Sequence, residues 1–303
     1  MKKTNYIFKM ALAVVASSWM LTSCDKIDEP YVIKKEVVDT VQCPVPDFPA
    51  VTNPEKRVLL EDYTGHTCVN CPRAAVTAHD LKQQYGEQLV VIAVHAGFFA
   101  KPLSAPFDYD FRTAAGTAWD DFFGIGKVGN PNGMVNRTGY PAQHILSPSA
   151  WGNAIATAVA VAPVAELQIL SDFDDETSKL CVHTKTTFLQ NISNREIKLS
   201  VVIVEDSIVQ AQKNNDAQVG TTPQIDDYVH MHVLRGAINS PWGEIILVKG
   251  AATGDPLIKS YQIKLEGFNK YEMDPANCRV VAVLYDGETY EVLQVSEAGI
   301  AEE

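Results

Sequence analysis

The pair Cys68 and Cys71 constrains the fold of this chain more than any other feature, because of the segments on either side of it. The apolar run at residues 58–60 predicts a strand, and residues 72–85 have the pattern of a helix. A strand, a Cys-x-x-Cys pair and a helix in this order are typical of a redox-active dithiol. Backbone N–H groups at the helix start would favour the thiolate of Cys68, and Cys71 would be the resolving thiol.

The same pair has other interpretations. It can be a structural disulfide or half of a zinc site, although a zinc site usually takes a second ligand pair and no other Cys-x-x-Cys exists here. Both cysteines and His66 could also hold copper. We predict no metal and no diffusible cofactor, because thiol–disulfide exchange needs neither.

The N-terminus predicts export. Three Lys precede a short apolar run at residues 10–21, which is too short to span a bilayer comfortably. Leu21-Thr-Ser-Cys24 resembles a bacterial lipobox, which implies cleavage before Cys24 and a lipid on that residue. An ordinary secretory signal is the alternative. The charged run at residues 25–29 resembles the export signal of surface lipoproteins. We therefore expect a lipid-anchored outer-membrane protein, with both the cell-surface and the periplasmic face left open.

Charge excludes some partners. Removing residues 1–23, which contain three Lys and no acidic residue, changes the formal net charge from −12 to −15. Such a chain is unsuited to nucleic acid or to anionic lipid surfaces. A hydrophobic content of 46% indicates a globular protein.

The chain changes character near Ala162-Pro163. Residues 25–54 are charged and then Pro-rich, which predicts a semi-rigid tether. Between residues 58 and 160, strand and helix patterns alternate, which predicts a βαβ unit with buried parallel strands. After residue 163, short β-rich segments separated by turn residues predict an antiparallel β-sandwich. We expect these segments at residues 164–170, 180–188, 197–204, 229–234, 244–248, 258–265, 279–285 and 290–295.

Residues 58–72 resemble the active-site segment of thioredoxin-fold proteins. Pro131 resembles the cis-proline that faces the dithiol in that fold, and an ordinary turn proline is the alternative. The resemblance also implies a buried acid that accepts a proton. Glu61 and Asp62 both stand near its position, but strand alternation lets only one of them point inward, so we expect the other to be solvated. The Val69-Asn70 spacer departs from the thioredoxin pattern and leaves the direction of electron flow open.

The mature chain also resembles the outer membrane protein 28 family of lipoproteins. The resemblance rests on residues 63–72, 133–137 and 228–235. It implies an α/β thioredoxin-like domain followed by an all-β immunoglobulin-like sandwich domain. We therefore expect a signal peptide at residues 1–23, a lipidated Pro-rich tether at 24–54, the thioredoxin-like domain at 55–162 and the β-sandwich domain at 163–303.

Several further side chains are candidates for a site. We expect His66 to be a solvent-exposed loop residue. His95 ends the second strand, where it could face the cleft near the cysteines, although a satisfied polar cap on a core strand is the more common role for such a residue. His230 and His232 would lie on one face of a strand, and Arg235 could join their hydrogen bonds, in a structural rather than a metal-binding role. Arg137 would form an ion pair with a carboxylate or hold the terminus of a peptide.

The remaining cysteines suggest a second disulfide. Cys181 and Cys278 lie in β-type segments of one predicted domain, so we predict a bond between them, with two buried free thiols as the alternative. Cys43, in the Pro-rich segment, is left without an assignment.

Two functions are consistent with these observations. In the first, the protein exchanges thiols and disulfides with envelope or surface proteins or peptides: Cys68 attacks, Cys71 resolves, Pro131 positions the substrate, and Glu61 or Asp62 handles the proton. In the second, the chain is a non-catalytic surface binding or adhesion module, and the Cys-x-x-Cys disulfide only staples its fold.

Overall fold

In the computed structural model, which describes residues 43–300, the strand that precedes Cys68 is β1 (Val58–Thr64). Helix α2 (Cys71–Tyr85) connects it to β2 (Leu89–His95), which runs parallel to β1. The predicted βαβ unit is therefore confirmed. Both strands are buried throughout, as a continuous apolar run requires. β3 (Asn132–Val135) pairs antiparallel with the other edge of β1.

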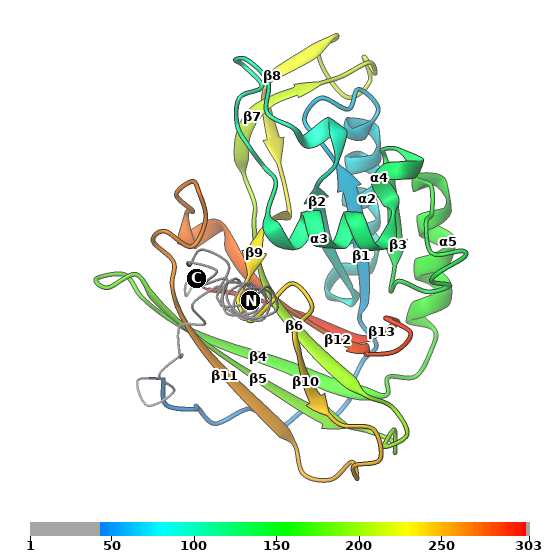
Figure 1. Ribbon diagram of the computed structural model, residues 1–303, viewed down its shortest axis with the longest axis vertical. Coiled ribbons are helices and arrows are strands. Elements are labelled where there is room, and N and C mark those ends of the chain that lie inside the picture. Colours follow the sequence, from blue (N-terminus) through cyan, green and yellow to red (C-terminus); the bar gives the residue numbers. More distant parts are fainter. Residues whose placement is uncertain (1–42, 301–303) are drawn as a thin grey trace, which may run out of the picture. The chain divides into compact units, whose positions relative to one another are not determined.

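One eight-stranded sheet extends across the boundary expected at residues 162/163. Its order is β13-β12-β6-β9-β2-β1-β3, and β10 pairs with β6 (Figure 1). The boundary falls between α5 (Pro148–Val159) and β4 (Ala165–Asp174), where helices give way to strands. The strands contributed from beyond it are β6 (Ile197–Glu205), β9 (Val233–Ala237), β10 (Glu244–Leu247), β12 (Cys278–Asp286) and β13 (Val292–Gly299).

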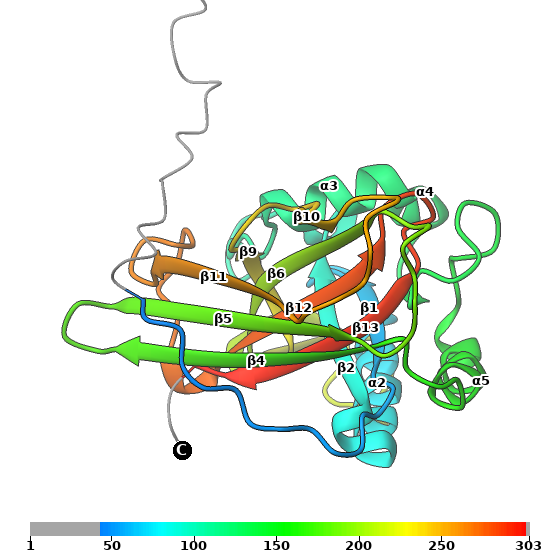
Figure 2. The same cartoon turned by 90° about the horizontal axis from the view of Figure 1, so that it is seen from below.

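Each face of this sheet is covered. On the β1–β3 side, α2 and α5 share an apolar core with one face, and α3 (Ala114–Phe123) covers the other. A three-stranded sheet, β11-β5-β4, shares a core with β6 and β12 (Figure 2). The molecule thus has a mixed α/β region and a β-rich region with several sheets. The remaining elements are β5 (Lys179–Phe188), β11 (Leu257–Lys264), α4 (Ile125–Val128), η2 (Gly86–Gln88), η3 (Phe98–Ala100) and η4 (Pro275–Asn277).

A separate hairpin leaves the sheet between β6 and β9. It consists of β7 (Ile208–Lys213) and β8 (Gln224–His230) and forms a two-stranded sheet of its own (Figure 1). The single strand predicted at residues 229–234 is wrong, because the backbone turns at His232, where φ is 56°. β7 was not predicted.

The second disulfide joins Cys43 to Cys181, so the predicted Cys181–Cys278 bond is wrong. The physical reason is strand alternation. Leu180 and Val182 point into the core between the two sheets, so Cys181 points to the outer face of β5. Cys278 faces that core as a buried free thiol, and burial raises its pKa to about 12.

The Pro-rich segment is bound to the β-sheet surface from Cys43 onward. Besides the disulfide, Gln168 of β4 donates to the carbonyl of Pro49, and Lys185 of β5 lies over the ring of Phe48. The segment runs along β4 and β5 in Figure 2. A free tether over residues 24–54 is therefore wrong for residues 43–54. Residues 1–42, with the predicted signal peptide and Cys24, lie outside the described part of the chain.

Candidate functional site

The Cys-x-x-Cys pair is a disulfide at the start of α2. Its Cα atoms are 5.4 Å apart, and Cys71 is the first residue of the helix. Cys68 and Cys71 are each only 2% exposed. The strand–cysteine–helix arrangement predicted from the sequence is thus present, but Cys68 does not lie open to solvent.

The hairpin is what covers this motif. The side-chain amide of Gln212 donates to the carbonyl of Cys68 at 2.9 Å. The backbone N–H of Lys213 donates to the carbonyl of His66 at 2.9 Å, and that of Asn215 to the carbonyl of Val69 at 3.1 Å. A macromolecular disulfide therefore cannot reach Cys68 in this conformation.

Side chains at the hairpin tip also contact α2. Arg73 Nε donates to Asp216 Oδ2 at 2.6 Å, and Arg73 Nη2 donates to Gln218 Oε1 at 3.1 Å. The backbone N–H of Gln218, followed by Arg73, lowers the pKa of Asp216. These side chains are partly exposed, with 43% exposure for Arg73 and 28% for Asp216, so the pair contributes little stability.

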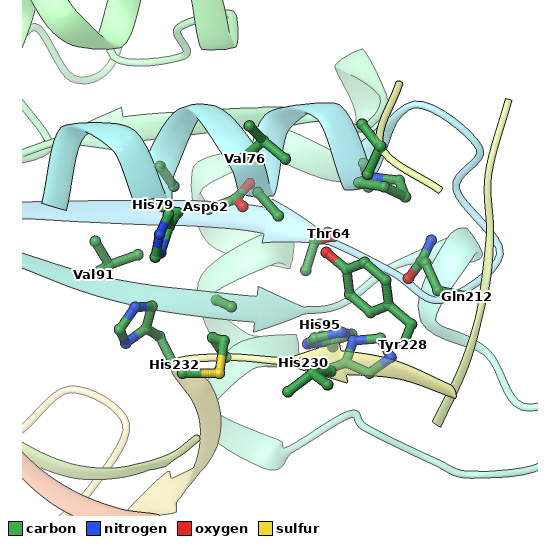
Figure 3. A pocket seen from close by; sticks show the side chains of 18 residues that line it. Asp62, Thr64, Val76, His79, Val91, His95, Gln212, Tyr228, His230 and His232 are labelled. Atoms are coloured by element: carbon green, nitrogen blue, oxygen red, sulfur yellow. The ribbon is translucent and has the colours of Figure 1, made fainter. Parts of the chain in front are cut away.

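A cavity of about 340 Å³ lies beside the disulfide, bounded by α2, β1, β2 and β8 (Figure 3). Cys71 lines it, whereas Cys68 does not. Figure 3 shows Asp62 beneath α2, with His95, Tyr228 and His230 gathered toward the hairpin side. The polar lining consists of Asp62, Thr64, His79, His95, Gln212, Tyr228, His230 and His232.

Asp62 is the acid that shares this cavity with Cys71. Asp62 is 4% exposed, and its Oδ1 has no hydrogen-bond partner. Burial raises the pKa of Asp62 from 3.8 to about 7. A carboxyl in this state can take up or release a proton near neutral pH.

Glu61 points to the opposite face of β1 and is committed to another partner. Arg137 Nε and Nη2 donate to its two carboxylate oxygens at 2.9 and 2.8 Å, and both side chains are at most 2% exposed. The ion pair expected for Arg137 is confirmed. The expectation that one of the two acids would be solvated is wrong, because α3 covers this second face of the sheet.

The Asn130–Pro131 peptide bond is cis, as predicted. Tyr63 pairs with Asn132, so the next position in the register sets Pro131 beside Thr64, where β1 ends and the loop to Cys68 begins. The role of Pro131 toward a substrate stays a prediction.

Three histidines gather around the ring of Phe111. The ring centroids of His66, His95 and His230 lie 5.6, 4.4 and 4.5 Å from it. Burial lowers the pKa of all three, to about 3 for His230, so they are neutral at neutral pH. The expectation that His66 is exposed is wrong, since the residue is 1% exposed.

His232 and Arg235 do not form one network with His230. His232 Nδ1 lies 3.2 Å from Asp206, and Arg235 Nε lies 2.9 Å from Glu205. His230 is the last residue of β8, whereas His232 lies in the turn between β8 and β9, so the expectation that both would lie on one face of a strand is wrong. Within residues 43–300, no group of three or more His, Cys, Asp or Glu side chains is arranged to hold a metal ion.

The hairpin residues that contact the motif were missed by sequence reasoning. A signal was available: residues 209–212 alternate apolar and polar side chains, and Asn214-Asn215 is turn-like. That signal could have revealed the hairpin but not its position over Cys68. The residues missed are Gln212, Lys213, Asn215, Asp216 and Tyr228.

The fold and the site define a protein with a mixed α/β region, a β-rich region and a covered Cys-x-x-Cys disulfide. The family model described as Outer membrane protein Omp28 matches residues 118–303, more than half of the sequence. The chain therefore belongs to the Omp28 family of outer membrane proteins. The match begins within α3 and leaves out β1, α2 and β2. No helix among the described residues is long and apolar enough to cross a membrane.

One solved structure shows a similar fold at low sequence identity. HBP35 of Porphyromonas gingivalis is 17% identical, with 82% of this chain and 76% of that chain covered and a TM-score of 0.59. A domain of the outer membrane lipoprotein Omp28 from Porphyromonas gingivalis is 23% identical over 46% of this chain and 90% of its own, with a TM-score of 0.32. No curated protein matches the sequence.

Proposed function

We propose that the protein carries out thiol–disulfide exchange through Cys68 and Cys71 on envelope proteins. The observation that carries the proposal is Asp62. A buried carboxyl with an unpartnered oxygen destabilises the fold, and no structural role accounts for it here. Its pKa of about 7 and its place in the same cavity as Cys71 suit a group that exchanges a proton with that thiol.

The reaction requires only these groups and a substrate disulfide. In the reduced protein, the Cys68 thiolate attacks a substrate sulfur, forms a mixed disulfide and releases one substrate thiolate. Cys71 then gives its proton to Asp62 and attacks the Cys68 sulfur. This step restores the Cys68–Cys71 disulfide and releases the second substrate thiolate. Two electrons pass from the protein dithiol to the substrate, and the reverse sequence oxidises a substrate dithiol.

The proposal also assigns a fold class to each of the two parts of the chain. The α/β part, with its cis-Pro131 beside the end of β1, is a thioredoxin-like domain, and the β-rich part is an immunoglobulin-like sandwich. What supports the first assignment is the order β1, Cys-x-x-Cys, α2, β2 together with the antiparallel β3. What supports the second is the core shared by two facing sheets.

Asp62→Asn should slow exchange in a pH-dependent way. In the unmodified protein the rate should rise through pH 7, because Asp62 must be ionised to accept the Cys71 proton. The variant should lose this rise and be about 100-fold slower at pH 8, the lower end of the usual range for removing a proton-transfer group. Insulin reduction, followed from pH 5 to 9, measures the effect, and Cys68→Ser should show no exchange at all.

Stability gives an independent check on Asp62. Its pKa is higher in the folded protein than in the unfolded chain, so the folded protein binds more protons between pH 4 and 7. The unmodified protein should therefore lose stability relative to Asp62→Asn as pH rises through this window. Equal pH dependence of urea unfolding in the two proteins would contradict the proposed proton acceptor.

We also propose that the protein is anchored in the outer membrane by lipid on Cys24 and faces the cell surface. Membership of an outer membrane protein family and the lipobox before Cys24 support this. Cys24→Ser should move the protein from the membrane fraction to the soluble fraction or leave its signal peptide uncleaved. Cys278→Ala serves as the control, because it alters a buried free cysteine, leaves both disulfides in place and should keep the membrane association. A membrane-bound and fully processed Cys24→Ser protein would rule out the lipid anchor.

The burial of Cys68 favours a second candidate function. If the hairpin never leaves the motif, the disulfide only staples the fold and the chain is a surface binding or adhesion module. In that case neither glutathione nor dithiothreitol should reduce the Cys68–Cys71 pair in the folded protein, and alkylation of reduced Cys68 should be no faster than that of an unperturbed thiol.

A further inference from the structure

We propose that the hairpin segment at residues 212–216 occupies the binding place of the substrate, and that the substrate is an extended polypeptide segment that displaces it. This rests on the proposed exchange function and names its substrate class and its regulation. The segment is an internal competitor for the Cys-x-x-Cys loop.

The contacts are of the kind that any polypeptide can make. Two of the four donors from the hairpin to the motif are backbone N–H groups, on Lys213 and Asn215, and the other two are the side-chain amides of Gln212 and Asn215. The two backbone N–H groups stand two residues apart, which is the spacing of N–H groups along one edge of an extended chain. Their acceptors, the carbonyls of His66 and Val69, flank Cys68 in the sequence. The motif therefore offers an acceptor edge that binds an incoming strand by its main chain.

The side chain of Gln212 contacts the reacting cysteine itself. The Gln212 amide donates to the carbonyls of Cys68 and Gly65, and its residue is 2% exposed. Gln212 also lines the cavity beside Cys71. Displacing this side chain would open Cys68 and the cavity together, and a substrate chain would take over the released acceptors.

Internal hydrogen bonds make the tip of the hairpin a single unit. The fully buried amide of Asn214 donates to the carbonyls of Asp216, Gly220 and Thr221, so the loop holds its own shape. Its attachments to α2 are the partly exposed Arg73–Asp216 pair and the hydrogen bond from Arg73 to Gln218. The carbonyls of the motif are therefore covered by a preformed loop, not by the core. The contacts that hold this loop against α2 are weak.

The experiment compares three forms of the full chain in insulin reduction and in reduction of the disulfide by dithiothreitol. The double variant Gln212→Ala/Asp216→Ala removes one hydrogen-bond donor to the motif and the ion pair that attaches the hairpin to α2. Asp227→Ala changes an exposed acid on β8 that does not line the cavity, and it is the matched control. We expect the double variant to reduce insulin at least about 10-fold faster, because each lost hydrogen bond is worth a factor of about 2 to 10.

A peptide probe tests the occupant directly. A synthetic peptide with the sequence of residues 210–217 should inhibit insulin reduction by the double variant and should inhibit the unmodified protein far less. Arg73→Gln, which leaves the hairpin sequence intact, should give a smaller acceleration and replaces the double variant if thermal unfolding shows that the latter does not fold.

The outcomes separate the two proposals. Equal insulin rates in all forms, with normal reduction by dithiothreitol, would overturn the internal competitor and leave the exchange function standing. If the double variant is reduced faster by dithiothreitol but reduces insulin no faster, the site admits small thiols and not polypeptides. That result also overturns the internal competitor. A disulfide that no reductant reaches in any folded form would remove the exchange function, and this inference with it.

Discussion

Replacing Cys43 with Ser should lower the free energy of unfolding by about 5 kcal/mol in the chain-entropy model, because the Cys43–Cys181 bond closes a loop of 138 residues. The loop includes β1 to β4 and the whole α/β region, so its closure restricts nearly half of the unfolded chain. The bond also fastens the Pro-rich segment to the outer face of β5. Urea unfolding under non-reducing conditions measures the change.

Cys278→Ala is the matched control for this variant. It alters a buried cysteine but leaves both disulfides in place, so it should cost only the packing of one sulfur atom, about 1 kcal/mol. A Cys43→Ser protein that unfolds within 1 kcal/mol of the unmodified one would show that the unfolded chain is not restricted by this bond.

Glu61→Gln should destabilise the protein by about 3–5 kcal/mol, since it leaves the guanidinium of Arg137 buried without its charge partner. The pair lies among apolar rings: Arg137 stands 5.4 Å from the ring of Trp119, 5.0 Å from Phe123 and 5.3 Å from Tyr285. Water cannot replace the lost carboxylate there. Unfolding by urea at pH 7 measures the loss.

A second substitution separates charge from packing. Adding Arg137→Met to Glu61→Gln removes the unpaired charge and should recover most of the lost stability. Glu288→Gln, which breaks the exposed Lys249–Glu288 pair, should change stability by less than about 1 kcal/mol. If the single Glu61→Gln variant is no less stable than Glu288→Gln, the buried pair does not stabilise the fold.

The local elements around the site could be predicted from the sequence. The apolar run of β1, the Cys-x-x-Cys pair and the helix ended by Gly86 each depend on residues close in the chain. Side-chain alternation also placed Glu61 and Asp62 on opposite faces correctly. The segment of residues 133–137 pointed to the family, and Pro131 to a cis peptide bond. The strand, the helix and the alternation follow from periodicity and from local backbone chemistry. The family and the cis bond at Pro131 follow from the resemblance of these segments to known families.

Only the tertiary structure decided what lies against each face. Alternation along β5 predicts that Cys181 points away from Leu180 and Val182. It does not predict that Cys43 lies on that outer face and bonds to Cys181. Alternation along β1 likewise predicts that Glu61 and Asp62 point to opposite faces of the sheet. It does not predict that α3 and Arg137 bury Glu61.

The same limit explains the hairpin. The sequence by itself determined the βαβ unit, the disulfide motif and the family of this protein. The contact between residues 212–216 and the loop of Cys68 joins segments more than 140 residues apart. Such a contact depends on the path of the chain through β6 and on the turn at His232, and no local pattern encodes a partner at that distance. The cover over Cys68, on which the choice between exchange and a structural disulfide depends, is therefore a property of the tertiary structure alone.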